Sequence, residues 1–163
     1  MKEVKIIDNF FDERIREKIF NLIVRRPKWK FGAGDFDNMF WSMDKLEQEE
    51  YFSEYLYGLI CSKLNKTFKN VLRIYANGQT AGQHGSLHTD DGDVTILYFP
   101  NPHWNQEQQG HLFFSEDGQS ITQVVEYKPN RLVMFPASLS HYPDAPHRLF
   151  PGLRISLAYK LEV

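Results

Sequence analysis

The sequence predicts an α+β protein in which helices come first and an antiparallel sandwich or barrel follows. In the first third of the chain, apolar residues recur with the period of a helix. After about residue 70, short β-branched and aromatic runs alternate with turn residues. A length of 163 residues is typical of one domain. We therefore expect one domain over 1–163, with a helical part over 1–70 and a β core over 71–163.

The predicted helices have apolar faces and a recognisable start. Asn9 or Asp12 can cap the first helix. The apolar face of this helix is formed by Ile15, Ile19, Leu22 and Ile23. A second amphipathic helix is expected from about 44 to 65, with Leu46, Phe52, Leu56, Ile60 and Leu64 among its apolar positions. The segment Trp29–Trp41 between them is rich in glycine and aromatic residues but has no clear period, and we expect a long loop there.

The β core is predicted from short runs separated by turn dipeptides. The expected strands are Val71–Ala76, Val94–Phe99, His111–Ser115, Ile121–Val125, Arg131–Phe135 and Leu153–Tyr159. The expected turns contain Asn77-Gly78, Asp91-Gly92, Asp117-Gly118 and Pro129-Asn130.

Composition excludes several classes of protein. A net charge of −2 and a pI near 6.3 give no electrostatic reason to expect nucleic acid or an anionic membrane as a partner. The single cysteine, Cys61, excludes an internal disulfide framework. The first residues, Met1–Lys5, lack the apolar region of a secretory signal. No run approaches the ~18 apolar residues of a membrane-spanning helix. We expect a soluble protein of the cytoplasm or another intracellular compartment.

One histidine motif points to a metal. All six histidines follow residue 80, and only His88 has an acid two residues later, in His88-Thr89-Asp90. Residues i and i+2 of a strand share a face, so His88 and Asp90 can reach one metal. A second histidine would complete a facial triad, which leaves three positions open on Fe(II). His141, just after Arg131–Phe135, and His147 are the candidates.

The last predicted strand carries an unusual cation. Alternation places Arg154, Ser156 and Ala158 on one face of Leu153–Tyr159. If this face points into a barrel, Arg154 is buried and needs an anionic partner, which a carboxylate ligand would supply. If the strand lies at an edge, Arg154 lies in water. The pattern alone leaves both arrangements open.

The order of these pieces resembles the prolyl 4-hydroxylase-like Fe(II)/2-oxoglutarate-dependent oxygenases. The resemblance covers about Val71 to Leu161. It includes Arg73–Gly78, His88-Thr89-Asp90, Val94–Trp104, Gly110–Phe114, Pro129–Phe135, the distal His141 and Arg154-Ile155-Ser156. This family has a double-stranded β-helix, or jelly roll. The resemblance therefore implies a jelly-roll core over 71–163 with the N-terminal helices packed on one sheet.

The resemblance also implies a function and a set of site residues. His88, Asp90 and His141 would bind Fe(II), and Arg154 would bind the distal carboxylate of 2-oxoglutarate with help from Ser156. Tyr75 would reach the co-substrate or the substrate, and Leu97 and Leu112 would line the pocket. With O₂, such an enzyme hydroxylates a C–H bond and releases succinate and CO₂. The implied substrate is a prolyl residue of a peptide or protein.

Two positions depart from the family pattern. Phe99 stands where a tyrosine commonly binds the same distal carboxylate. The spacing from His141 to Arg154 is a few residues longer than usual, which keeps His147 as a rival ligand, although His141 directly follows a predicted strand. The segment Trp29–Trp41 is a candidate lid.

Two other functions remain compatible with the sequence. One is a non-catalytic jelly-roll module that binds a metal or a sugar. The other is a zinc hydrolase, since two histidines and a carboxylate also suit zinc. The zinc hydrolase is disfavoured because no HExxH motif and no obvious general base are present.

Overall fold

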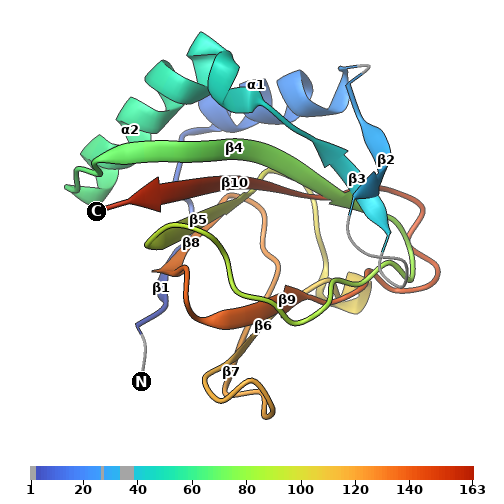
Figure 1. Ribbon diagram of the computed structural model, residues 1–163. Helices are drawn as coiled ribbons and strands as arrows, with labels where there is room; N and C mark the ends of the chain where they lie inside the picture. Colours follow the sequence, from blue (N-terminus) through green and yellow to red (C-terminus); the bar gives the residue numbers. More distant parts are fainter. Residues whose placement is uncertain (1–2, 27, 34–38) are drawn as a thin grey trace.

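A computed structural model describes residues 3–26, 28–33 and 39–163, and shows two antiparallel sheets that face each other (Figure 1). Within these ranges the larger sheet has the strand order β1-β8-β5-β10-β4-β3-β2, and the smaller one has the order β7-β6-β9. The strands are β1 (Lys5–Ile7), β2 (Lys30–Ala33), β3 (Phe40–Met43), β4 (Asn70–Gln79), β5 (Val94–Phe99), β6 (Leu112–Ser115), β7 (Gln123–Val125), β8 (Arg131–Pro136), β9 (Ser140–Pro143) and β10 (Arg154–Glu162).

The helices precede most of the sheet in the chain and lie beside one face of the larger sheet (Figure 1). They are α1 (Glu13–Val24) and α2 (Tyr57–Leu64), with a 3₁₀ turn η1 (Leu46–Gln48) and a π-helical segment η2 (Tyr51–Leu56) before α2. A short 3₁₀ turn, η3 (Gln106–Gln108), precedes β6. No helix in the described ranges is long and apolar enough to cross a membrane.

Of the two residues expected to cap the N-terminal helix, Asp12 is the one that does so. Asp12 accepts a hydrogen bond from the backbone N–H of Ile15 at 3.0 Å, which satisfies one of the free donors at the helix start. At the other end of the helical part, Asn65 adopts a left-handed conformation with φ of 50° and its N–H returns to the carbonyls of Cys61 and Ser62. The short polar side chain of asparagine makes this conformation accessible.

Three expectations about local structure are wrong. The segment Trp29–Trp41 contains the strand β2 and the start of β3, which extend the larger sheet beyond β4; residues 34–38 lie outside the described part. Asn77-Gly78 is not a turn but the end of the long strand β4. A Cβ on Gly78 would lie 2.9 Å from side-chain atoms of Leu153, so the glycine serves close packing there. The second helix is not one regular helix but three helical segments.

The larger sheet separates two apolar cores. The core on its helical side joins residues of α1, η2 and α2 to alternate residues of β4, β5 and β10. Tyr159 of β10 donates a hydrogen bond to the carbonyl of Phe52 at 3.1 Å and stacks on Tyr57. The second core lies between the two sheets and includes Leu97 and Leu112. Strand β10 therefore faces a different environment on each side.

Candidate metal and co-substrate site

Two backbone segments bring three possible metal ligands together at the opening between the sheets. His88 and His141 form an isolated antiparallel bridge, with N–H to O distances between their backbones of 3.1 and 2.8 Å. The backbone N–H of Asp90 donates to the carbonyl of Ala137 at 2.9 Å. One potential ligand atom from each of His88, Asp90 and His141 lies within 4.8 Å of the others. The backbone pairing thus positions the triad.

The hydrogen bonds of the two imidazoles assign their tautomers. Nδ1 of His88 lies 2.8 Å from the carbonyl of Ser86, and Nδ1 of His141 lies 2.9 Å from the carbonyl of Leu139. Since a carbonyl only accepts, each Nδ1 carries a proton, and the neutral ring presents the lone pair of Nε2. This arrangement of the outer nitrogen is typical of histidine metal ligands.

The Nε2 atoms converge on the Asp90 carboxylate. They lie 3.6 Å from Oδ1 for His88 and 3.3 Å from Oδ2 for His141. Lone pairs facing a carboxylate repel it unless a cation, either a proton or a metal ion, lies between them. Asp90 accordingly raises the pKa of His88. Two imidazole nitrogens and one carboxylate are a donor set that fits Fe(II).

The Asp90 carboxylate is itself held by buried donors. Thr95 Oγ1 donates to Oδ2 at 2.6 Å, and the Lys160 ammonium donates to the same oxygen. Burial raises the pKa of Asp90, but the interactions of its carboxylate with the His141 and His88 rings and with the charge of Lys160 outweigh this effect, so the pKa lies well below its usual range. The carboxylate is therefore ionised at neutral pH.

Arg154 is a buried cation that the described residues leave without a carboxylate partner. Its Nε donates to the carbonyl of Gly110 at 2.6 Å and one terminal nitrogen donates to Gln79 Oε1 at 2.9 Å. The guanidinium lies 4.7 Å from the ring centre of Tyr127. Burial lowers the pKa of Arg154 to about 10, so it is still charged at neutral pH. The arrangement with Arg154 in water is excluded, and the buried arrangement is observed.

A glycine makes room for this guanidinium. Gly110 has a φ of +74°, and a Cβ there would lie 2.9 Å from Cδ of Arg154. A larger residue would be strained in its backbone and would displace the arginine. Gly110 therefore fixes both the carbonyl that Arg154 binds and the space that it occupies.

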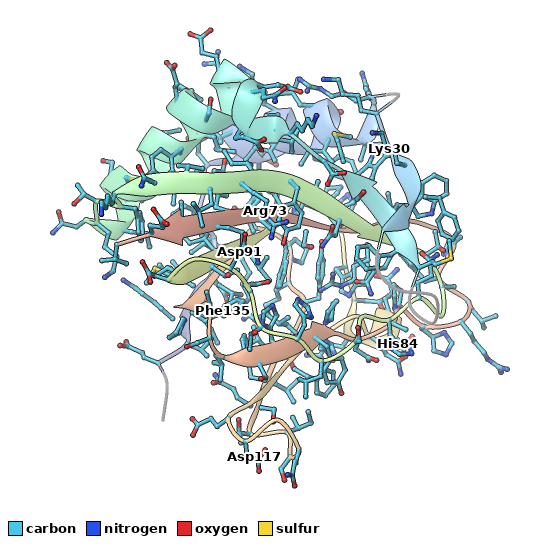
Figure 2. The ribbon with its side chains drawn as sticks, viewed as in Figure 1. Lys30, Arg73, His84, Asp91, Asp117 and Phe135 are labelled. Carbon is cyan, nitrogen blue, oxygen red and sulfur yellow. The ribbon has the colours of Figure 1, made fainter. Side chains whose placement is uncertain are left out.

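A cavity of about 390 Å³ joins the triad to Arg154. Its walls include most of the residues expected from the sequence, namely Tyr75, His88, Leu97, Leu112, His141, Arg154 and Ser156. The side chains between the two sheets are drawn in Figure 2, where Arg73 of β4 points toward Asp91. These two residues form an ion pair of 2.5 Å, and Arg73 is part of the cavity wall.

The rival histidine lies elsewhere. The backbone N–H of His147 donates to the carbonyl of Gln108, and its Nδ1 accepts from the N–H of Leu149. Within the described ranges, the possible metal-binding cluster contains His141 and not His147. His84 also lies outside this cluster, and its ring Nδ1 lies 3.1 Å from the carbonyl oxygen of Gly85.

Several residues of the cavity wall were not expected from the sequence. They are Phe40, Ser42 and Asp44 at β3, Arg73 and Asn77 of β4, and Lys160 of β10. The position of Lys160 on the cavity wall could have been predicted, since it continues the alternation of Arg154, Ser156 and Ala158 by one more step. The β3 residues had none, because their position depends on a strand pairing that has no local pattern.

Phe99, which replaces the usual tyrosine, has no hydroxyl and stacks on another aromatic ring. Phe99 is fully buried and stacks on Tyr127 with ring centres 4.4 Å apart. The Tyr127 hydroxyl donates to the carbonyl of Ile155 at 2.6 Å and contacts Asn101. Both aromatic residues thus support Arg154 from one side, and the Tyr127 hydroxyl is already bonded.

Comparison with known proteins identifies the fold. No protein-family model matches this chain, and no curated protein matches it in sequence. Among solved structures, a prolyl hydroxylase from Trichoplax adhaerens, in complex with a hypoxia inducible factor oxygen degradation domain peptide fragment, matches with a TM-score of 0.72 and 18% identity. That match covers 99% of this chain and 84% of the other.

Two further structures show how widely the fold is used. A Pseudomonas putida prolyl-4-hydroxylase matches with a TM-score of 0.75 and 14% identity, over 100% of this chain and 94% of the other. The non-heme alpha ketoglutarate dependent epimerase SnoN from nogalamycin biosynthesis matches with a TM-score of 0.67 and 9% identity, over 98% and 76%. The chain therefore has the jelly-roll fold of the 2-oxoglutarate oxygenases, as the sequence resemblance implied, while the fold alone does not fix the reaction.

Proposed function

We propose that this protein is an Fe(II)- and 2-oxoglutarate-dependent dioxygenase that hydroxylates a C–H bond of its substrate. The observation that carries the proposal is the pairing of two features in one cavity. One is the His88–Asp90–His141 cluster. The other is Arg154, a buried cation that the described carboxylates leave unpaired on the same cavity wall. A metal chelator with a distant carboxylate fits both features, and 2-oxoglutarate is such a molecule.

In this proposal, the residues of the triad bind the metal and Arg154 binds the co-substrate. His88 and His141 present Nε2 to the metal and Asp90 presents a carboxylate oxygen. Arg154 donates to the distal carboxylate of 2-oxoglutarate in a fork that a planar guanidinium allows, with Ser156 beside it. Bound iron, with 2-oxoglutarate and O₂, would supply the oxidation of the C–H bond and release succinate and CO₂.

The remaining wall residues control water and substrate. Leu97 and Leu112 are buried and present apolar surface to the cavity, which keeps water away from the reacting groups. Tyr75 lies on the same wall, and burial raises the pKa of its hydroxyl, so the hydroxyl stays protonated and can donate to a co-substrate or substrate oxygen.

We further propose a prolyl residue of a peptide or protein as the substrate. The support is the resemblance of the motifs and the fold shared with prolyl hydroxylases, one of them in complex with a peptide fragment. The similarity to an epimerase shows that this part of the proposal needs its own test. Succinate formation should be measured with a panel of proline-containing peptides and with otherwise identical peptides that contain alanine.

The first test removes a proposed metal ligand. His88→Ala and Asp90→Ala should each abolish the slow, substrate-free conversion of 2-oxoglutarate to succinate, because two ligands hold iron far more weakly than three. Succinate formation and oxygen uptake would be measured with added Fe(II). His147→Ala is the matched control and should keep the wild-type rate, since His147 lies outside the cluster.

Two results would contradict the proposal. A wild-type rate in either ligand variant would show that the metal is bound elsewhere. Binding of metal by the wild-type protein without any oxygen uptake on addition of 2-oxoglutarate would favour the non-catalytic module.

A further inference from the structure

A lysine lies buried beside the proposed metal ligand Asp90 and has no task in the proposed reaction. The Lys160 side chain is 1% exposed. Its ammonium donates to Asp90 Oδ2 and lies 3.2 Å from Thr95 Oγ1, which donates to the same carboxylate oxygen. Pairing of β5 with β10 places Thr95 opposite Lys160, so the strand register builds this arrangement.

The stability of the fold does not account for such a pair. Removing an ammonium and a carboxylate from water costs about as much free energy as their attraction returns. Apolar residues of similar volume would fill the same space without that cost. The pair instead affects the geometry of the carboxylate.

The two oxygens of Asp90 have different surroundings. Oδ2 accepts hydrogen bonds from both Thr95 and Lys160, and it also lies 3.3 Å from Nε2 of His141. Oδ1 faces Nε2 of His88 at 3.6 Å. The two donors engage lone pairs of Oδ2, whereas no hydrogen-bond donor other than the His88 ring faces Oδ1 among the contacts of the described residues, so Oδ1 is available to a cation.

We infer that Lys160 is a positioning residue that, together with Thr95, restricts Asp90 to one metal-binding oxygen. The inference rests on the proposed metal site and goes beyond it. A carboxylate that binds through both oxygens takes a second coordination position. Restriction to one oxygen preserves the three open positions of a facial triad, which a chelating keto acid and O₂ need.

The charge of Lys160 has a second consequence. The ammonium cancels part of the negative charge of Asp90 and so weakens its attraction for a divalent cation. Lys160 thus lowers metal affinity while it keeps coordination positions open. A residue that only stabilised the fold would not show these opposite effects.

The test uses Mn(II) as a probe of the apo protein and needs no turnover. Mn(II) affinity and the number of metal-bound waters, from the relaxation of water protons, would be measured before and after addition of 2-oxoglutarate. Lys160→Met should bind Mn(II) about tenfold more tightly, hold fewer waters and bind 2-oxoglutarate about tenfold more weakly. Lys160→Gln keeps a donor without the charge, so it should bind Mn(II) more tightly and retain the wild-type number of waters.

The control lies on the opposite face of the same strand. Tyr159→Phe removes a buried hydrogen bond to Phe52 without touching Asp90, and it should leave all three measurements unchanged. Weaker Mn(II) binding in both Lys160 variants, with the water number unchanged, would overturn the inference. If Lys160→Met does not fold, Thr95→Val decides the matter, because loss of one donor to Oδ2 should still reduce the number of bound waters.

These outcomes also separate the inference from the proposed function. If the wild-type protein binds Mn(II) but 2-oxoglutarate displaces no water, the dioxygenase proposal fails. The comparison of Lys160→Met with Lys160→Gln would still report how many oxygens of Asp90 bind the metal.

Discussion

The two faces of strand β10 are equally buried but chemically opposite. On the helical side, Ile155, Leu157, Tyr159 and Leu161 join the larger apolar core. On the cavity side, Arg154, Ser156, Ala158 and Lys160 alternate with them, and all are buried as well. One strand therefore serves as the centre of the hydrophobic core and as a wall of the candidate site.

The difference between the faces shows how a small domain can hold buried charge. Two charged side chains are costly in an apolar interior. Here they share a strand with four large apolar side chains whose burial contributes ~1.5–3 kcal/mol each. The free energy gained on one face thus offsets the cost of the polar groups on the other. It follows that substitutions on the two faces should have separable effects.

The largest effect on stability is expected on the helical face. Leu157 is fully buried in the apolar core, and Leu157→Ala should lower the free energy of unfolding by ~2–5 kcal/mol, because it leaves a cavity. Urea denaturation would measure this loss. Ser156→Ala, one residue away on the cavity face, is the matched control and should change stability far less. Equal losses in the two variants would break the proposed separation.

The next largest effect is expected on ligand binding from the cavity face. Arg154→Met should raise the 2-oxoglutarate concentration needed for half-saturation by about tenfold or more, since a charge-assisted hydrogen bond contributes ~1.5–3 kcal/mol. Arg154→Lys keeps the charge but cannot form the two-point hydrogen bond of a guanidinium. Its affinity for 2-oxoglutarate should therefore lie between those of the wild-type protein and Arg154→Met. Calorimetric titration of the Mn(II)-loaded protein would measure the affinities. An unchanged affinity in Arg154→Met would place the co-substrate anchor elsewhere.

The cavity face of β10 was partly predictable from the sequence. Alternation placed Arg154, Ser156 and Ala158 together, and it holds in the structure. The pattern could not show that the strand is central, because alternating polar and apolar residues also describe an edge strand in water. Only the pairing of β10 with both β4 and β5 decides this point.

The His88–Asp90–His141 triad was also predictable only in part. The spacing of His88 and Asp90 indicated a shared face, but they do not belong to a regular strand. A single bridge to His141 positions His88, and a backbone hydrogen bond to Ala137 positions Asp90. The choice between His141 and His147 depended on which one follows a strand closely, and the observed cluster contains His141. The β3 part of the wall was not predictable, since it depends on pairing with β4 across a long stretch of chain.

The smallest effect is expected where the cavity face meets solvent. Arg73 lies opposite Lys160 in the strand register, yet its side chain is 55% exposed and pairs with Asp91, which is 51% exposed. Because water and salt screen such a pair, Arg73→Gln should change the free energy of unfolding by less than ~1 kcal/mol, and the change should shrink further at high salt. Urea denaturation at low and high salt would measure it. A larger loss that persists at high salt would mean that the charged region around Asp90 extends to the mouth of the cavity and stabilises the fold as a network.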